Sequence, residues 1–253
     1  MIVVNGSAGP LLDVAGKVLT RDDLPAAALI GGLAVTIRVA AHNLPYRATG
    51  DIDLVTDDDT PTLVEILTGD TGGPDPVVVV VDDIKVDVIP TAAVTDQDLD
   101  GIEDGPRLFV AAHRWALESA ANVTVATTAA LDAAHTIRVA TPAGLIATKS
   151  HAVGFARSQR RSSKHGSDLF DVYRLLDAHG PDEIASALHT APGRIAPVIA
   201  DVIRATFLTR PGKAAALMTP VDTPLIDAHD VSSLMDSFVS ALDLASLGDD
   251  LHV

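Results

Sequence analysis

The chain has 253 residues and a formal net charge of −16 at pH 7, and 47% of its residues are hydrophobic although only 3% are aromatic. It contains no cysteine, which excludes disulfides and thiolate metal sites, so a bound metal must be held by Asp, Glu, His or Asn. No apolar run approaches the roughly 20 residues of a membrane helix, and the N-terminus has no signal-peptide pattern, so we expect a cytoplasmic protein without a membrane partner.

Helix and strand patterns alternate along the first part of the chain, up to about residue 140. In chain order the segments are a weak helix at 11–19, a short apolar strand at 27–30, a small-residue helix at 33–42, a half-buried strand at 51–55, a helix at 60–67, a Gly/Pro/Asp loop at 69–76, and strands at 77–81, 84–89, 123–127 and 136–140. Asp82 and Asp83 are the turn residues between two of these strands. Alternation of this kind predicts a sheet that is covered by helices.

From Thr141 onward the pattern becomes helical. Thr141 is a plausible cap, and Pro142 stands at the first helical position. Apolar residues at helical spacing recur within 169–176, 184–188, 195–207 and 234–244, and no convincing strand pattern interrupts them. We therefore predict an α/β fold with two parts, a mixed α/β part over residues 1–140 and a helical part over residues 141–253.

Two acidic residues on one strand pattern give the central chemical signal. In Asp51-Ile52-Asp53 both carboxylates point to the same face, because residues i and i+2 of a strand do so. Close carboxylates repel each other unless a cation lies between them, and Mg²⁺ prefers a few carboxylates together with phosphate oxygens. Asp87 lies on the strand pattern at 84–89, and it completes a three-carboxylate metal site if that strand neighbours the first. The alternative is an ordinary ion pair between Asp87 and Lys85.

Gly31-Gly32 stands between a strand pattern and a helix pattern. Without side chains, backbone N–H groups can approach phosphate oxygens, and the N-terminus of a helix favours anions. A Gly-Gly pair alone is commonly just a tight turn, and Asp-x-Asp alone is commonly a solvated strand. The combination of Gly-Gly, a helix, two acids on one strand and a third acid on another favours a functional site.

A basic window lies in the otherwise acidic chain. Between Ala133 and Ser167 there is no Asp or Glu, and six of the 18 Lys and Arg residues fall there, namely Arg138, Lys149, Arg157, Arg160, Arg161 and Lys164. The net charge argues against a nucleic-acid partner, but such a patch would attract a polyanion locally. A solvated helix end followed by a basic loop is the equally plain alternative.

The basic window contains Lys149 and is followed by two acidic residues. Lys149 and Arg157 are eight residues apart and share one helix face with Val153, where they suit a triphosphate. Asp168 and Asp171 are expected in the first turn of the next helix, where the helix dipole already favours carboxylates. The alternative for Lys149 is a surface lysine whose head reaches solvent.

These segments resemble a known family. Ile30-Gly31-Gly32-Leu33-Ala34-Val35, followed by Arg47-Ala48-Thr49-Gly50-Asp51-Ile52-Asp53-Leu54, resembles the first motif of the AbiEii-like nucleotidyltransferases, which include the toxins of AbiE type IV toxin–antitoxin systems and the mycobacterial MenT toxins. Lys149 in Leu145–Ala152, then Arg157 and Asp168-Leu169-Phe170-Asp171-Val172-Tyr173, is similar to the later motifs of that family. Gly32 departs from the Gly-Ser that many members of the polymerase-β-like superfamily have, so it offers only its backbone N–H to phosphate.

The resemblance implies a polymerase-β-like core with a mixed sheet over residues 1–140 and a helical domain over 141–253 that completes the active site. It implies Mg²⁺ or Mn²⁺ as cofactor, an NTP as nucleotide donor and the 3′ end of tRNA as acceptor, and a toxin of this type is expected to have a neutralising antitoxin. The implied catalytic residues are Asp51, Asp53, Asp87, Lys149 and one of Asp168 and Asp171, with the first three as metal ligands. The implied NTP-binding residues are Gly31, Gly32, Arg47, Lys149 and Arg157.

Two other functions remain open at this point. The same chemistry could modify a small-molecule hydroxyl, such as that of a cationic antibiotic, for which an acidic surface would be favourable. The chain could also be an inactive binding protein that keeps the fold, although the presence of all three acidic residues argues against it.

Overall fold

The computed structural model describes residues 1–21, 26–42, 47–57, 77–155, 162–219 and 226–249. The helix and loop expected at 60–67 and 69–76 lie outside these residues, as do Arg157, Arg160 and Arg161. The chain divides into two compact units, one of residues 1–93 and 113–141 and one of residues 94–112 and 142–253. Residues 94–112 therefore cluster with the second unit, whereas the division proposed from the sequence, at residue 140, groups them with the first part.

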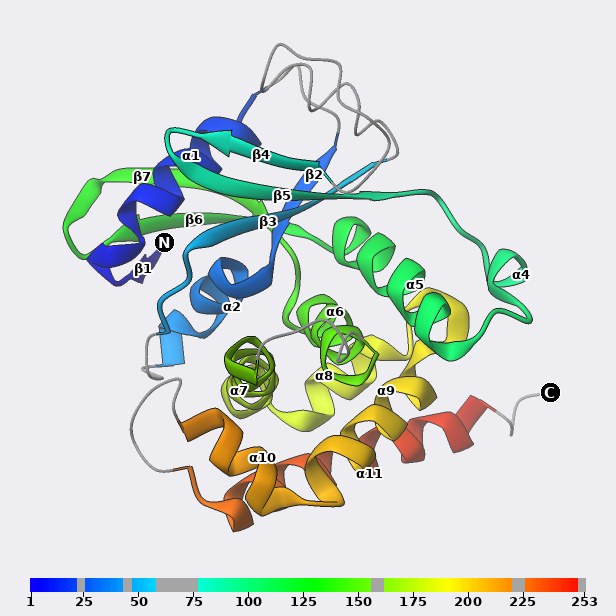
Figure 1. The fold of residues 1–253 in the computed structure, drawn as a ribbon. Helices are drawn as coiled ribbons and strands as arrows, with labels where there is room; N and C mark the ends of the chain where they lie inside the picture. Colours follow the sequence, from blue (N-terminus) through cyan, green and yellow to red (C-terminus); the bar gives the residue numbers. More distant parts are fainter. Residues whose placement is uncertain (22–25, 43–46, 58–76, 156–161, 220–225, 250–253) are drawn as a thin grey trace. The chain divides into compact units, whose positions relative to one another are not determined.

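In the described part of the first unit, seven strands form one mixed sheet (Figure 1). The strands are β1 (Ile2–Val4), β2 (Ala27–Ile30), β3 (Asp51–Asp57), β4 (Val77–Val81), β5 (Ile84–Thr91), β6 (Ala121–Thr127) and β7 (Ala130–Val139). Their order is β1-β6-β7-β2-β3-β5-β4, so β1 and β4 are the edge strands. The pairs β1–β6, β2–β7 and β3–β5 are parallel and the other three are antiparallel. The mixed sheet confirms the predicted fold class, although the pattern of β1 was missed.

Two helices of this unit pack against the sheet, α1 (Gly9–Leu19) and α2 (Gly31–Val39), with the short turns η1 (Gly6–Ala8) and η2 (Ala40–His42) beside them. α2 is built from small and aliphatic residues and is buried along nearly its whole length. The half-buried guanidinium of Arg38 donates to the carbonyl oxygens of Val139 and Ala140, at 2.6 and 2.8 Å. These bonds fix the end of α2 to the end of β7, and α2 also packs against β3.

The turn between β4 and β5 has an unusual backbone. Asp82 and Asp83 both have positive φ, at 49° and 64°. Two successive positive φ values are those of the tight hairpin turn that favours Asn-Gly or Asp-Gly, because its twist matches the twist of the strands. The sequence indicated this turn correctly, although its second position lacks the usual glycine.

Replacing Asp83 with Gly should therefore stabilise the first unit. Glycine adopts positive φ without the steric penalty that any side chain incurs, and we expect a gain of roughly 0.5–1 kcal/mol in the free energy of unfolding. Urea unfolding of Asp83→Gly beside the wild type measures it. An unchanged or lowered stability would show that the Asp83 side chain itself supports the turn.

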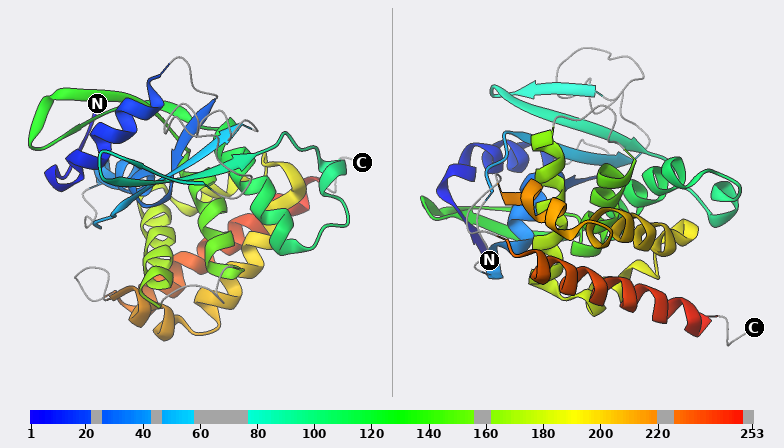
Figure 2. Two further views of the ribbon diagram at one scale, coloured as in Figure 1. Left: turned by 45° about the horizontal axis from the view of Figure 1, so that its top comes forward. Right: turned by 60° about the horizontal axis from the view of Figure 1, so that its bottom comes forward.

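The second unit is helical. Its elements are α4 (Asp96–Leu99), α5 (Asp104–Glu118, whose last residues belong to the first unit), α6 (Pro142–Gly154), α7 (Ser162–His179), α8 (Pro181–Leu188), η4 (Pro192–Arg194), α9 (Ile195–Ile203), the π-helical turn η5 (Arg204–Leu208), α10 (Pro211–Met218) and α11 (Ala228–Asp249). α6 packs against α7, α8 and α9, and Figure 2 shows these helices from two further sides. No strand follows β7 in the described part of the chain, as predicted. None of the described helices has the length and hydropathy needed to cross a membrane.

Candidate active site

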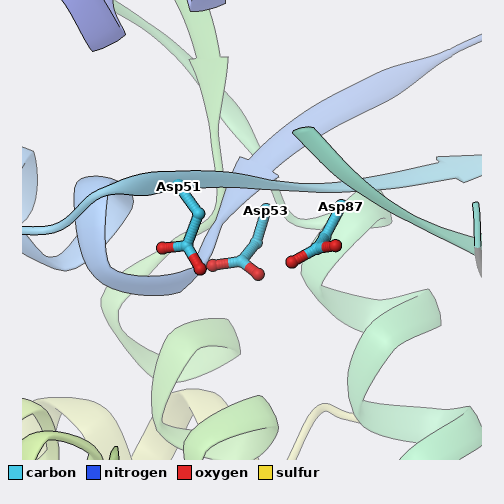
Figure 3. Close-up of side chains that lie close together, drawn as sticks. All are labelled: Asp51, Asp53 and Asp87. Carbon is cyan, nitrogen blue, oxygen red and sulfur yellow. The ribbon is translucent and has the colours of Figure 1, made fainter. Parts of the chain in front are cut away.

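Three carboxylates gather on one face of the sheet (Figure 3). β3 and β5 pair in parallel, with Asp53 opposite Asp87 and Asp51 opposite Lys85. One oxygen of each carboxylate of Asp51, Asp53 and Asp87 lies within 4.8 Å of the others, and all three residues are half-buried. The strand of Asp87 thus neighbours the strand of the other two acids, which is the arrangement that the sequence left open.

The opposite face of the same strands explains why the carboxylates stand where they do. Ile52 and Leu54 of β3, and Val86 and Val88 of β5, are at most 1% exposed. A shift of one residue in either strand would bury the acids and expose these aliphatic side chains, so burial fixes the register. The common face of Asp51 and Asp53 is therefore a consequence of the two-residue period, whereas the pairing of β3 with β5 brings Asp87 to them.

The donor set of this carboxylate triad, formed by Asp51, Asp53 and Asp87, fits a divalent cation. Mg²⁺ binds oxygen at about 2.0–2.1 Å, so two oxygens on one ion are at most roughly 4.2 Å apart, which is close to the 4.8 Å within which these three oxygens lie. Oxygen donors without sulfur or nitrogen are those that Mg²⁺ and Mn²⁺ prefer. Three negative charges so close also repel one another, and a cation between them removes this repulsion.

Lys85 lies beside the triad. Its Nζ is 2.6 Å from Oδ2 of Asp87, and its side chain is 48% exposed. The hydrogen bond to Asp87 raises the pKa of Lys85, and the charges of Asp87, Asp51 and Asp53 act in the same direction against the opposing effect of burial. The ion pair that the sequence offered as an alternative is thus present. A carboxylate has about four lone-pair sites, however, so pairing with Lys85 is compatible with Asp87 as a metal ligand.

Gly31 is where α2 meets the triad. Its φ is +69°, a value that side-chain-bearing residues rarely adopt, and a Cβ atom built on it would lie 1.9 Å from Oδ2 of Asp53. Both the backbone turn and the close approach of a carboxylate therefore require glycine at this position. The N-terminus of α2 consequently stands directly beside Asp53.

Gly32 gives room to two further side chains. A Cβ atom there would lie 2.8 Å from Nη2 of Arg47 and 3.0 Å from Oγ1 of Thr49. Thr49 in turn donates its hydroxyl hydrogen to Oδ1 of Asp51, at 3.1 Å. The structure thus brings Gly31, Gly32 and Arg47 together with the triad. Thr49 lies within the motif from Arg47 to Leu54, although the sequence alone indicates no role for it.

We predict that Gly31→Ala is far more damaging than Gly32→Ala. At Gly31 the new methyl meets a carboxylate of the triad on a left-handed backbone, which should cost about 2 kcal/mol or more in stability and displace Asp53. At Gly32 the nearest atom belongs to the flexible end of Arg47, which can move away. Thermal unfolding of both variants compares the two positions, and equal losses would contradict this description of Gly31.

The second unit contains a separate cluster of buried charges. Nζ of Lys149, on α6, lies 2.7 Å from Oδ1 of Asp168 and 2.8 Å from Oδ2 of Asp171, both on α7. Nη2 of Arg174 donates to Oδ1 of Asp171 at 3.1 Å, and its guanidinium lies 5.0 Å from the ring centre of Phe170. The four charged residues are between 0% and 8% exposed. Two positive and two negative charges balance, so this ion cluster, formed by Lys149, Asp168, Asp171 and Arg174, is neutral.

The structure excludes one alternative and contradicts one expectation about these residues. Lys149 is not the surface lysine that the sequence offered as an alternative, because it is buried against two carboxylates. Asp168 and Asp171 are not in the first turn of their helix, because α7 already begins at Ser162. The helix dipole therefore does not explain them, and their ion pairs with Lys149 do. Both acids contact Lys149, so the geometry does not single out one of them.

Arg174 is the one member of the ion cluster that we did not predict from the sequence. It follows Asp171 by three residues and Phe170 by four, so all three side chains lie near one another on α7. The available signal was a charged residue inside the otherwise apolar run from Val172 to Leu176. Such a residue can be buried only with an opposite charge beside it.

Comparison with protein families matches residues 17–244 to the family described as nucleotidyl transferase AbiEii toxin, type IV toxin–antitoxin system. The match covers most of the chain and includes the positions of the triad, of Gly31-Gly32 and of the ion cluster. It confirms the resemblance inferred from the motifs. A comparison with curated proteins finds no match.

Proposed function

Because the chain belongs to the AbiEii family of nucleotidyltransferase toxins of type IV toxin–antitoxin systems, we propose that it transfers a nucleotide from an NTP to the 3′ end of tRNA in a reaction that needs Mg²⁺ or Mn²⁺. The observation that carries the proposal is the carboxylate triad beside the N-terminus of α2. Phosphoryl transfer requires two elements, namely acids that hold a cation and a helix N-terminus that binds phosphate.

Asp51, Asp53 and Asp87 are the residues that hold the cation in this proposal. When bound, a divalent ion there supplies positive charge that polarises the phosphates of the NTP. The backbone N–H groups of Gly31 and Gly32 donate hydrogen bonds to phosphate oxygens, because these two residues begin α2 and carry no side chains. Arg47, which packs over Gly32, adds a guanidinium for the same oxygens.

The reaction itself is a displacement at the α-phosphorus. The 3′ oxygen of the acceptor forms a bond to that phosphorus, the bond to the bridging oxygen of the β-phosphate breaks, and pyrophosphate leaves. Asp87, on β5, accepts the proton of the attacking hydroxyl. Thr49 keeps Asp51 oriented through its 3.1 Å hydrogen bond.

In the second unit, Asp168 and Asp171 hold the ammonium group of Lys149 in place, and family membership is the ground for proposing these three residues as further residues of the active site. The two short ion pairs and the burial of all three residues support this positioning. Arg157 lies outside the described residues and beyond Gly154, where α6 ends, so its helical spacing from Lys149 gives no support, and it is proposed as an NTP-binding residue from family membership alone. Family membership implies an antitoxin as partner, and the cations of the basic window from Ala133 to Ser167, apart from the buried Lys149, support a polyanionic acceptor.

The direct experiment incubates the purified protein with Mg²⁺, total tRNA and each of the four α-labelled NTPs in turn. We expect label on intact tRNA with at least one NTP, and none on tRNA whose 3′-terminal diol has been oxidised with periodate. Equal labelling of oxidised tRNA would place the acceptor elsewhere on the molecule. No labelling with any NTP would contradict tRNA as the acceptor and leave a small-molecule hydroxyl to be tested.

A further inference from the structure

The edge strand β4 exposes two valines beside the triad. Val78 pairs with Asp87 and Val80 pairs with Lys85 in the antiparallel register of β4 and β5. Directly paired residues share a face of the sheet, so both valines lie on the face that carries the acids. They are 54% and 65% exposed, whereas Val79, which points to the opposite face, is 2% exposed.

The strand registers arrange these side chains in two rows across the sheet. One row runs from Ile30 through Asp53 and Asp87 to Val78, and Gly31 directly follows its first member. The neighbouring row runs from Asp51 through Lys85 to Val80. The start of α2 thus lies at one end of the acids, and the exposed valines lie at the other.

The direction of these rows has a chemical consequence, which rests on the function proposed above. In phosphoryl transfer the attacking and leaving oxygens are roughly in line on opposite sides of the phosphorus. If the pyrophosphate leaves on the side of Gly31, the attacking hydroxyl comes from the side of β4. The acceptor then approaches Asp87 from the side on which Val78 and Val80 lie.

We propose that Val78, Val80 and Lys85 form an acceptor platform, on which the two valines contact the base of the acceptor's terminal nucleoside and the Lys85 ammonium contacts a phosphate of the same strand. A nucleotide at the end of a strand combines an apolar base face with an anionic phosphate, and the platform offers the complementary pair of surfaces.

Other exposed apolar side chains of the first unit lack this setting. Val3 lies on β1, the opposite edge strand, and Leu131 lies on β7. Neither strand carries an acid of the triad or pairs with a strand that does. We therefore assign the exposed surface of Val78 and Val80 to the acceptor because these valines pair with Asp87 and Lys85.

The double variant Val78→Thr, Val80→Thr tests the platform. Threonine keeps the branched shape that strands favour but replaces one methyl group of each valine by a hydroxyl. We expect the KM for tRNA to rise about five- to tenfold, with the KM for the NTP and the kcat within about twofold of the wild type. Val3→Thr, the same substitution on the opposite edge strand, should change none of these quantities.

A second variant tests the opposite direction. Val78→Ile, Val80→Ile enlarges the apolar surface and should leave the KM for tRNA unchanged or lower it, so a rise would overturn the proposal. An unchanged KM for tRNA in the threonine variant, or a raised KM for the NTP instead, would also overturn it. A change of oligomeric mass in that variant would assign the face to a second copy of the chain. If the wild type labels no tRNA, the proposed function itself is contradicted, and this result is obtained before any variant is compared.

Discussion

Replacing Asp53 with Asn should lower the rate of nucleotide transfer by at least about a thousandfold, while the protein without metal becomes no less stable. Asn has the same shape as Asp, so it still fits against Gly31, but it weakens cation binding at the triad. It also removes one of three negative charges that lie within 4.8 Å of one another, which relieves their repulsion. Initial rates of labelling and thermal unfolding measure the two effects separately.

Asp57→Asn is the matched control for this variant. Asp57 lies on the same strand, β3, but its carboxylate pairs with Arg114 at 2.6 Å and its side chain is 51% exposed. We expect the transfer rate of Asp57→Asn to stay within about twofold of the wild type. Added Mg²⁺ should raise the Tm of the wild type and of Asp57→Asn but not that of Asp53→Asn. An Asp53→Asn variant with more than a tenth of the wild-type rate would show that the triad is not the catalytic centre.

The second large effect concerns stability. Asp171→Ala should lower the free energy of unfolding by about 3–5 kcal/mol, the usual consequence of breaking a buried ion pair. Without Asp171, Lys149 keeps its ion pair with Asp168, whereas the buried Arg174 loses its ion pair with Asp171. Urea unfolding followed by circular dichroism measures the loss.

A surface pair of the same geometry provides the control. Asp201 and Arg204 are also three residues apart on one helical segment, at 2.8 Å, but their side chains are 77% and 41% exposed. Asp201→Ala should therefore change stability by no more than about 0.5 kcal/mol. Adding Arg174→Met to Asp171→Ala should recover part of the loss, because it removes the unbalanced charge. If Asp171→Ala were as mild as Asp201→Ala, the ion cluster would not hold α6 to α7.

Much of the triad followed from local sequence patterns. The period of two in Asp51-Ile52-Asp53 and in residues 84–89 gave the faces of both strands, and Gly31-Gly32 marked the start of a helix. The sequence did not show that Asp87 lies beside Asp51 and Asp53, because the pairing of β3 with β5 joins segments more than 30 residues apart. Only the fold shows that Asp53 and Asp87 are directly paired.

Other elements were missed for identifiable reasons. α5 buries Leu108, Ala111, Ala112 and Trp115 at helical spacing, but Gly105-Pro106 near its start reads as a turn. The early start of α7 was missed because its first residues are polar and include Gly166, and this error led to the wrong position of Asp168 and Asp171 in the helix. The burial of the ion cluster depends on packing between α6 and α7, which no local pattern encodes.

The most direct test of the account compares the fate of two labels in one reaction with tRNA and Mg²⁺. Label in the α-phosphate of the NTP should appear on the 3′ end of tRNA, whereas label in the γ-phosphate should appear only in released pyrophosphate. Both signals should disappear when EDTA is present or when Asp53 is replaced by Asn. Transfer of the γ label to tRNA, or transfer of the α label by Asp53→Asn at the wild-type rate, would contradict a nucleotidyltransferase centred on Asp51, Asp53 and Asp87.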